Sequence, residues 1–188
     1  MWLEFDGGQV DMDVFALALG KTVVLAHNFE ANCKWVAANQ MFASRRTAES
    51  PGIFGDMQFE ELKKFLMGPR PLGRQIKALR SATSDQLEVL DKGRKARNYV
   101  VHEAGRAVIQ PVEDTRDFIG YRHQVRHLLS SAEAIAEADY IVAHWRYSLA
   151  KSRDPAINTH VPKDYSRLCV RWIAAGLADG PMLSMDRQ

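Results

Sequence analysis

The sequence has little cysteine, no long apolar run and no glycine-rich phosphate loop, and each absence excludes a class of protein. Its two cysteines, Cys33 and Cys169, lie far apart in 188 residues, so neither a disulfide framework nor a cysteine-based zinc site is predicted. No uninterrupted apolar stretch approaches the roughly 18 residues that a membrane span needs. A nucleophile elbow and a zinc-protease signature are also missing.

The overall composition is typical of a globular chain, with 46% hydrophobic and 26% charged residues. These values exclude collagen-like, low-complexity and strongly disordered classes. At this length we expect residues 1–188 to form a single domain. The N-terminal residues include acids where a signal peptide has a basic start and an apolar run. We therefore expect a cytoplasmic protein that does not bind a membrane.

The net charge of +2 conceals a segregation of charge along the chain. Residues 1–62 contain 4 basic and 9 acidic residues, whereas residues 63–106 contain 11 basic and 4 acidic ones. Residues 107–188 are balanced, with 10 of each. A basic middle segment is either a site for a polyanion or a set of solvated helix faces, and charge alone favours neither interpretation.

Hydrophobic spacing and turn residues predict helices throughout the chain. The expected helices cover residues 11–43, 57–67, 84–105, 116–150 and 163–178. The first is either one long helix or two with a kink near Gly20, and Ser84 is the expected N-cap of the third. A glycine- and proline-rich linker containing Arg70 and Arg74 is expected before Ser84. Because no period-2 strand is visible, the predicted fold class is an all-α bundle of four to six helices.

One segment, residues 94–106, carries residues suited to chemistry. On a helix, Asn98 and His102 lie one turn apart on one face, together with Arg94. Arg97 is about 140° away from His102, but its long side chain can swing toward that face. Small and apolar residues occupy the opposite side, which can pack closely against another helix: Val89, Gly93, Ala96, Val100 and Ala104.

A histidine, guanidinium groups and an amide on one helix face suit phosphodiester chemistry. Imidazole can transfer protons near neutral pH, either to activate a ribose 2′-hydroxyl or to protonate a leaving oxygen. Arginine binds phosphate oxygens in a bidentate manner and stabilises charge that develops in the transition state. Neither step requires a metal. The alternative interpretation is a plain surface histidine beside a common Arg-Asn pair.

Residues Arg97–His102, which read RNYVVH, resemble the Arg-(polar)-x₃-His signature of HEPN domains, which are small all-helical proteins. The acidic Glu103 after the histidine and the loop that follows are similar to that family too. The resemblance is sharp over residues 84–106. Elsewhere it consists of helical architecture and length, so it implies an HEPN-like bundle.

The resemblance implies a metal-independent endoribonuclease that cleaves RNA through 2′-hydroxyl attack, of toxin or antiviral-defence type. It assigns His102 as general acid/base, Arg97 as phosphate binder and Asn98 as the polar residue that orients them. It implies no cofactor and no metal. The further residues that would contact substrate or tune the histidine are Arg94, Glu103 and Arg106.

The same resemblance implies particular partners. HEPN proteins typically form homodimers in which two motifs face one another across a cleft, so Arg97 of one subunit could serve the phosphate near His102 of the other. RNA and an antitoxin protein are the other expected partners. Toxins of this family that are modified by a nucleotidyltransferase antitoxin carry a tyrosine two residues after the histidine. Here that residue is Ala104, and Tyr99 does not substitute for it, so we do not predict that regulation.

Two other functions remain open at this point. The chain could be a non-catalytic HEPN-like binding or dimerisation module, or an unrelated helical regulatory protein. In the latter case Arg97 and His102 would lie on open surface, distant from any cleft. His123 and His127 have the spacing of a two-histidine metal edge, but no third ligand is evident. We expect them, with Arg122 and Arg126, to form a basic surface that receives RNA or the antitoxin.

Overall fold

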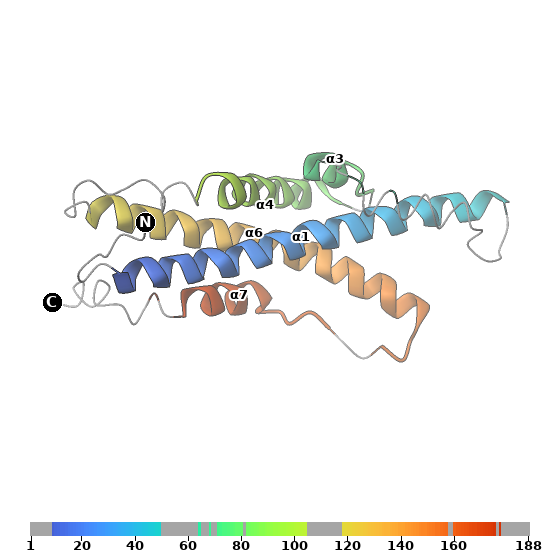
Figure 1. Cartoon of the computed structure of the whole chain (residues 1–188). Helices are drawn as coiled ribbons and strands as arrows, with labels where there is room; N and C mark the ends of the chain where they lie inside the picture. Colours follow the sequence, from blue (N-terminus) through green and yellow to red (C-terminus); the bar gives the residue numbers. More distant parts are fainter. Residues whose placement is uncertain are drawn as a thin grey trace.

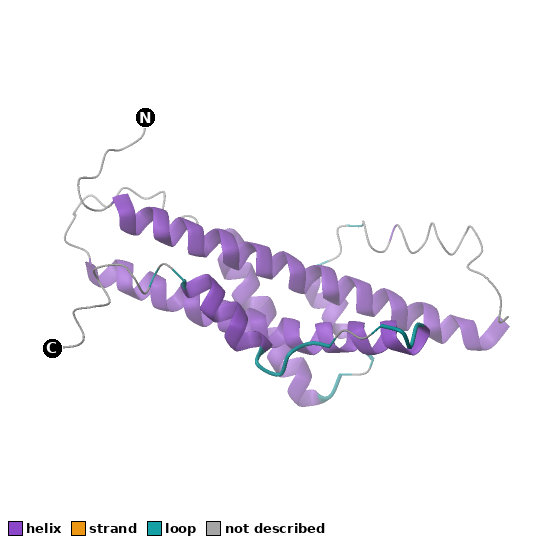
Figure 2. Ribbon diagram, turned by 90° about the horizontal axis from the view of Figure 1, so that it is seen from below, coloured by secondary structure: helices purple, strands orange, loops and turns teal. Residues whose placement is uncertain are grey.

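The computed structural model describes residues 9–49, 64, 68, 71–80, 82–104, 118–157, 160–175 and 177. These residues form five helices, and none of them belongs to a strand. Seen from below, the described secondary structure consists of helices and their connecting loops (Figure 2). The predicted all-α class is therefore confirmed for the described part of the chain.

Two long helices form the centre of the bundle, and three shorter helices pack around them (Figure 1). The helices are α1 (Gln9–Glu49), α3 (Leu72–Lys77), α4 (Ser84–His102), α6 (Phe118–Arg153) and α7 (Tyr165–Ala174). Helices α3 and α4 lie on one side of the α1–α6 pair and α7 lies on the other (Figure 1). The shared core contains large buried side chains from α1, α4, α6 and α7: Phe15, Phe29, Leu90, Leu128, Ile135 and Ile173.

Helix α1 passes through Gly20 as one continuous helix, so the first of the two alternatives, one long helix, is confirmed. A Cβ atom at Gly20 would meet nothing within 4 Å. An 18-residue window within Asp13–Gln40 of this helix has a mean hydropathy of 1.2 and passes the length and composition test for a membrane span. The segment is not an uninterrupted apolar run, since it contains Lys21, His27 and Glu30. The core helix of a bundle passes the same test, and 33% of the window is buried inside this one.

Helix α3 occupies part of the segment that was predicted to be a linker. Pro71 precedes it with an extended backbone (φ −56°, ψ 134°), which suits a proline at a helix start. The helix buries Leu72, Gln75 and Ile76 against α1 and α4. The helix is only six residues long. Because isolated helices of this length have marginal stability, this burial is its main source of stability. Local sequence spacing therefore gave too little signal to predict it.

The N-cap of helix α4, which carries the motif, lies one residue earlier than predicted. Its N-cap is Thr83, not Ser84: the Thr83 hydroxyl accepts a hydrogen bond from the Gln86 backbone N–H at 3.3 Å. The Gln86 side-chain oxygen accepts one from the Thr83 N–H at 3.0 Å, which completes a capping box. The helix ends at His102 instead of near Gly105.

The small-residue face of α4 packs against α6, as predicted. Gly93, Val100 and Ala104 are buried. A Cβ atom at Gly93 would lie 2.4 Å from the Ala138 Cβ and 3.1 Å from the Ala134 oxygen. The close approach of α4 and α6 therefore depends on the glycine, and it turns the opposite, polar face of α4 outward.

The remaining predictions are confirmed in part. Helices α6 and α7 exist, but their bounds are Phe118–Arg153 and Tyr165–Ala174, so α7 is shorter than expected. Cys33 is fully buried, whereas Trp172 on α7 is 48% exposed. The helix predicted over 57–67 lies outside the described residues apart from the helical Lys64.

Candidate active site

Three of the predicted motif residues line one open cavity of about 410 Å³ on the α3–α4 side of the bundle. They are Arg94, Arg97 and Asn98, which successive turns of α4 present to the same space. Glu30 of α1 and residues 71–73 at the start of α3 supply the other walls. The cavity is therefore built where α4 meets two helices that are distant in sequence.

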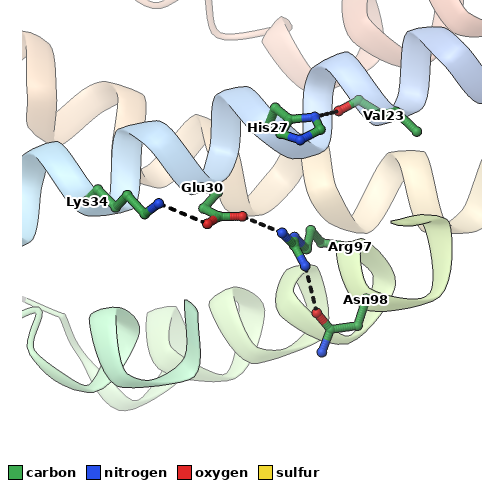
Figure 3. A network of polar contacts seen from close by, with 6 residues as sticks. All are labelled: Val23, His27, Glu30, Lys34, Arg97 and Asn98. Carbon is green, nitrogen blue, oxygen red and sulfur yellow. Dashed lines mark hydrogen bonds and ion pairs between the residues drawn. The ribbon is translucent and has the colours of Figure 1, made fainter. Parts of the chain in front are cut away.

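Arg97 is held at this cavity by a carboxylate from α1. Its Nη2 donates to Glu30 Oε2 in an ion pair in which both side chains are 18% exposed. Its Nη1 donates to Asn98 Oδ1 at 3.3 Å, and its buried Nε has no hydrogen-bond partner among the described residues. Figure 3 shows the guanidinium between Glu30 and Asn98, with Lys34 on the far side of Glu30.

Glu30 supplies the negative charge that balances the cations of this cluster. Its Oε1 also accepts an ion-pair contact from Lys34 Nζ at 3.1 Å. Burial by itself would raise the pKa of the Glu30 carboxyl. The hydrogen bond from Lys34 and the charges of Arg97 and Lys34 outweigh burial, so the pKa lies below its usual value. Glu30 is therefore ionised at neutral pH and competes with any anion for Arg97.

Arg94 is oriented within its own helix. Its Nε donates to Asp91 Oδ1 at 2.8 Å, and Asp91 also pairs with Lys95 at 3.0 Å. The Arg94 stem lies against α3, where its Cδ would be 3.4 Å from a Cβ atom placed on Gly73. Gly73 and Arg94 together line this part of the cavity.

His102 is not brought into the cavity. It is the last residue of α4, it is exposed, and it is not among the residues that line the space. Glu103, the C-cap residue, is also exposed, and Arg106 lies outside the described residues. Within one chain the structure thus assembles Arg94, Arg97 and Asn98, and it leaves His102 and Glu103 on the surface beyond them.

The histidines on α6 lie on an exposed face, as expected from their position opposite Val125. The His123 and His127 ring centroids are 6.3 Å apart, and the His127 ring lies 3.8 Å from the ring of Tyr99 on α4. Among the described residues, no group of three or more potential metal ligands is present. His127 thus packs against an aromatic ring of the motif helix.

Two features of this molecule were missed by sequence reasoning. Glu30 gave no signal beyond an ordinary i,i+4 pair with Lys34, because only the tertiary fold places it beside Arg97. Asp139 did leave a signal. It falls on the apolar stripe of α6 between Ile135 and Val142, and it is fully buried. A carboxylate at a core position of an amphipathic helix marks a polar network.

That network lies on the opposite side of the bundle from the motif. Asp139 Oδ1 accepts a hydrogen bond from Asn32 Nδ2 at 2.8 Å. Asp139 Oδ2 accepts from Asn28 Nδ2 at 2.9 Å and from the Tyr165 hydroxyl at 2.5 Å. Burial raises the pKa of Asp139 although these three donors lower it. The pKa of Tyr165 is also raised, by burial first and then by Asp139.

No protein-family model, curated protein or solved structure matches this chain. The chemistry of the site therefore rests on the geometry above and on the motif in α4.

Proposed function

We propose that this chain is a metal-independent endoribonuclease of the HEPN type, which cleaves RNA through attack of a 2′-hydroxyl. The observation that carries the proposal is the convergence of Arg94, Arg97 and Asn98 on one cavity, with His102 exposed one turn beyond Asn98. Two guanidinium groups and an amide are suited to hold the non-bridging oxygens of a phosphodiester.

The proposed reaction uses His102 as the proton-transfer group. The imidazole of His102 takes the proton of a ribose 2′-hydroxyl, and the 2′-oxygen attacks the adjacent phosphorus. The bond from phosphorus to the 5′-oxygen breaks, and an imidazolium returns a proton to that leaving oxygen. The products are a 2′,3′-cyclic phosphate and a 5′-hydroxyl. Arg97 stabilises the negative charge that develops on the phosphoryl oxygens.

The position of His102 outside the cavity favours a homodimeric enzyme. Because His102 does not line the cavity of its own chain, a phosphate at Arg97 needs a proton-transfer group from elsewhere. In a symmetric dimer, α4 of the second subunit can supply that histidine. The proposal therefore includes a composite site, RNA as substrate and a cytoplasmic protein of toxin or antiviral-defence type, with an antitoxin protein as a further partner.

A non-catalytic binding or dimerisation module is the second candidate function, and one observation favours it. Arg97 already has a carboxylate partner in Glu30, and its side chain is only 18% exposed. An arginine whose charge is satisfied inside the bundle also stabilises the packing of α4 on α1. This candidate predicts that RNA or a partner protein binds without being cleaved.

The two candidates are separated by an RNA cleavage assay with the purified protein in EDTA. We expect cleavage by the wild type, and a loss of about 10²- to 10⁴-fold in rate for His102→Ala. Arg97→Ala should lose about 10²- to 10³-fold. His144→Ala, which removes an exposed histidine of α6, is the matched control and should cleave like the wild type.

Each other outcome has a defined meaning. Cleavage that neither Arg97→Ala nor His102→Ala reduces would contradict the proposed site. Binding of RNA without cleavage by the wild type would favour the non-catalytic module. Cleavage that EDTA abolishes would point to a metal-dependent reaction and direct attention to His123 and His127.

A further inference from the structure

A second open cavity, of about 430 Å³, lies on the α7 side of the bundle, away from the motif. Three parts of the chain form it: α1, the C-terminal half of α6, and the segment that leads into α7. Its polar walls are Asn28, Asn32, Arg146, His160 and Tyr165. Apolar side chains, including Ala143, Ile157 and Val161, complete the lining. A polar end beside an apolar wall is the usual make-up of a small-molecule site.

The charge of this lining is of one sign. Among the described residues that line the cavity, Arg146 and His160 are basic and none is acidic. The buried carboxylate of Asp139 lies behind the wall, and its two oxygens are occupied by Asn28, Asn32 and Tyr165. The cavity therefore presents basic groups and amide groups to a ligand, and no carboxylate.

Arg146 is held in position although no acidic side chain among the described residues pairs with it. Its Nη1 donates to Asn32 Oδ1 at 2.7 Å, and its guanidinium lies 5.6 Å from the centre of the Trp35 ring. Asn32 is in turn fixed by its bond to Asp139. A guanidinium has five N–H donors. Because the guanidinium of Arg146 is already oriented by Asn32, its other donors can bind anionic oxygens.

We propose that this cavity binds a small organic anion, whose carboxylate or phosphate oxygens contact Arg146 and whose apolar part lies against Ala143, Ile157 and Val161. The chain of contacts from Tyr165 through Asp139 and Asn32 to Arg146 preorganises the cationic end. This site is separate from the α4 cavity, since the two share no lining residue. A test of anion binding at this cavity therefore does not depend on whether the chain is a ribonuclease.

The test is a titration of the full chain, followed by amide NMR, with three aromatic probes of similar size: benzoate, phenyl phosphate and neutral benzamide. We expect saturable shifts at residues 143–150 and 157–165 with at least one of the two anions. The affinity for benzamide should be at least about tenfold weaker, because the charge-assisted contacts to Arg146 are missing.

Variants assign the effect to the guanidinium. Arg146→Gln should weaken the binding of the anion about tenfold or more, because charged hydrogen bonds to the probe are lost. Lys151→Gln removes an exposed cation of the same helix that does not line the cavity, and it should bind like the wild type. If Arg146→Gln fails to give a folded spectrum, His160→Gln, at an exposed position, tests the same cavity with a smaller expected loss.

Several results would overturn the proposal. They are the absence of saturable shifts at this cavity with either anion, equal affinity for benzamide, and equal affinity in the cavity variant and the Lys151→Gln control. Shifts confined to α4 and Glu30 would also overturn it, since the anion would then occupy the motif cavity.

Discussion

The two cavities of this protein use polar residues in opposite ways. On the α4 side, Arg97 and Asn98 are partly exposed, and Arg97 joins Asn98 to the carboxylate of Glu30. On the α7 side, Asp139 is fully buried and holds donors from two other helices, α1 and α7. The α4 cluster is therefore partly open to solvent. The Asp139 network is part of the core itself.

Helix α1 separates these two environments through its own periodicity. Asn28 and Asn32 lie one turn apart and face Asp139, whereas Glu30, midway between them in sequence, faces α4. Residues two apart on a helix point in roughly opposite directions. One helix thus supplies the acceptor for Arg97 and two of the donors for Asp139.

The sharpest test of the α4 side mixes two inactive variants, Arg97→Ala and His102→Ala. In a composite dimer, a mixed pair contains one site with both Arg97 and His102 intact. Statistical mixing of a twofold dimer should then restore about a quarter of the wild-type cleavage. If each active site is built within one chain, the mixture should stay at background, which would exclude the composite arrangement. Native mass spectrometry of chains that carry tags of different mass verifies that mixed dimers form.

On the α7 side the largest expected effect is on stability. Asp139→Ala leaves Asn28, Asn32 and Tyr165 without their acceptor and opens a space in the core. We expect a loss of about 3 kcal/mol in the free energy of unfolding, measured by denaturant titration. Asp13→Ala, at an exposed position of α1, should change it by less than about 0.5 kcal/mol. Equal effects of the two variants would contradict the structural role of Asp139.

The packing of α4 on α6 is tested by replacing Gly93, with Gly20 of α1 as the control. Gly93→Ala places a Cβ atom 2.4 Å from the Ala138 Cβ and should reduce stability by about 1–3 kcal/mol. Gly20→Ala meets nothing within 4 Å and should increase stability by up to about 1 kcal/mol through helix propensity. Thermal unfolding of both variants measures this. A neutral Gly93→Ala would show that α4 and α6 can separate without cost.

The smallest expected effect concerns the Glu30 carboxylate. Since its pKa is lowered in the folded state, Glu30 stabilises the fold above the ordinary carboxyl pKa. That contribution is lost as the pH falls through the lowered value. At pH 7, Glu30→Gln should cost about 1–2 kcal/mol, and the difference from wild type should shrink below about pH 4. Unfolding curves from pH 3 to pH 8 measure it. A constant difference across that range would argue against the ion pairs.

Much of the α4 side could be predicted from local sequence. Gly93 and Val100 repeat at helical spacing, and Asn98 and His102 share a face by periodicity alone. The N-cap was predicted one residue too late, at Ser84 instead of Thr83, although Thr83 and Gln86 form a capping box. These features depend on contacts within four residues, so the chain order contains them. Helix α3 could not be predicted in this way, because its burial against α1 and α4 offsets its short length and its glycine.

The sequence by itself determined that this protein is a helical bundle and that one helix carries an Arg-Asn-x₃-His motif on its polar side. Only the tertiary structure decided that Arg97 pairs with Glu30, that His102 stays outside the cavity, and that Asp139 organises a second cavity around Arg146. The reason is physical. Periodicity sets which face a residue occupies on its own helix, whereas an ion pair or a buried hydrogen bond depends on which other helix covers that face.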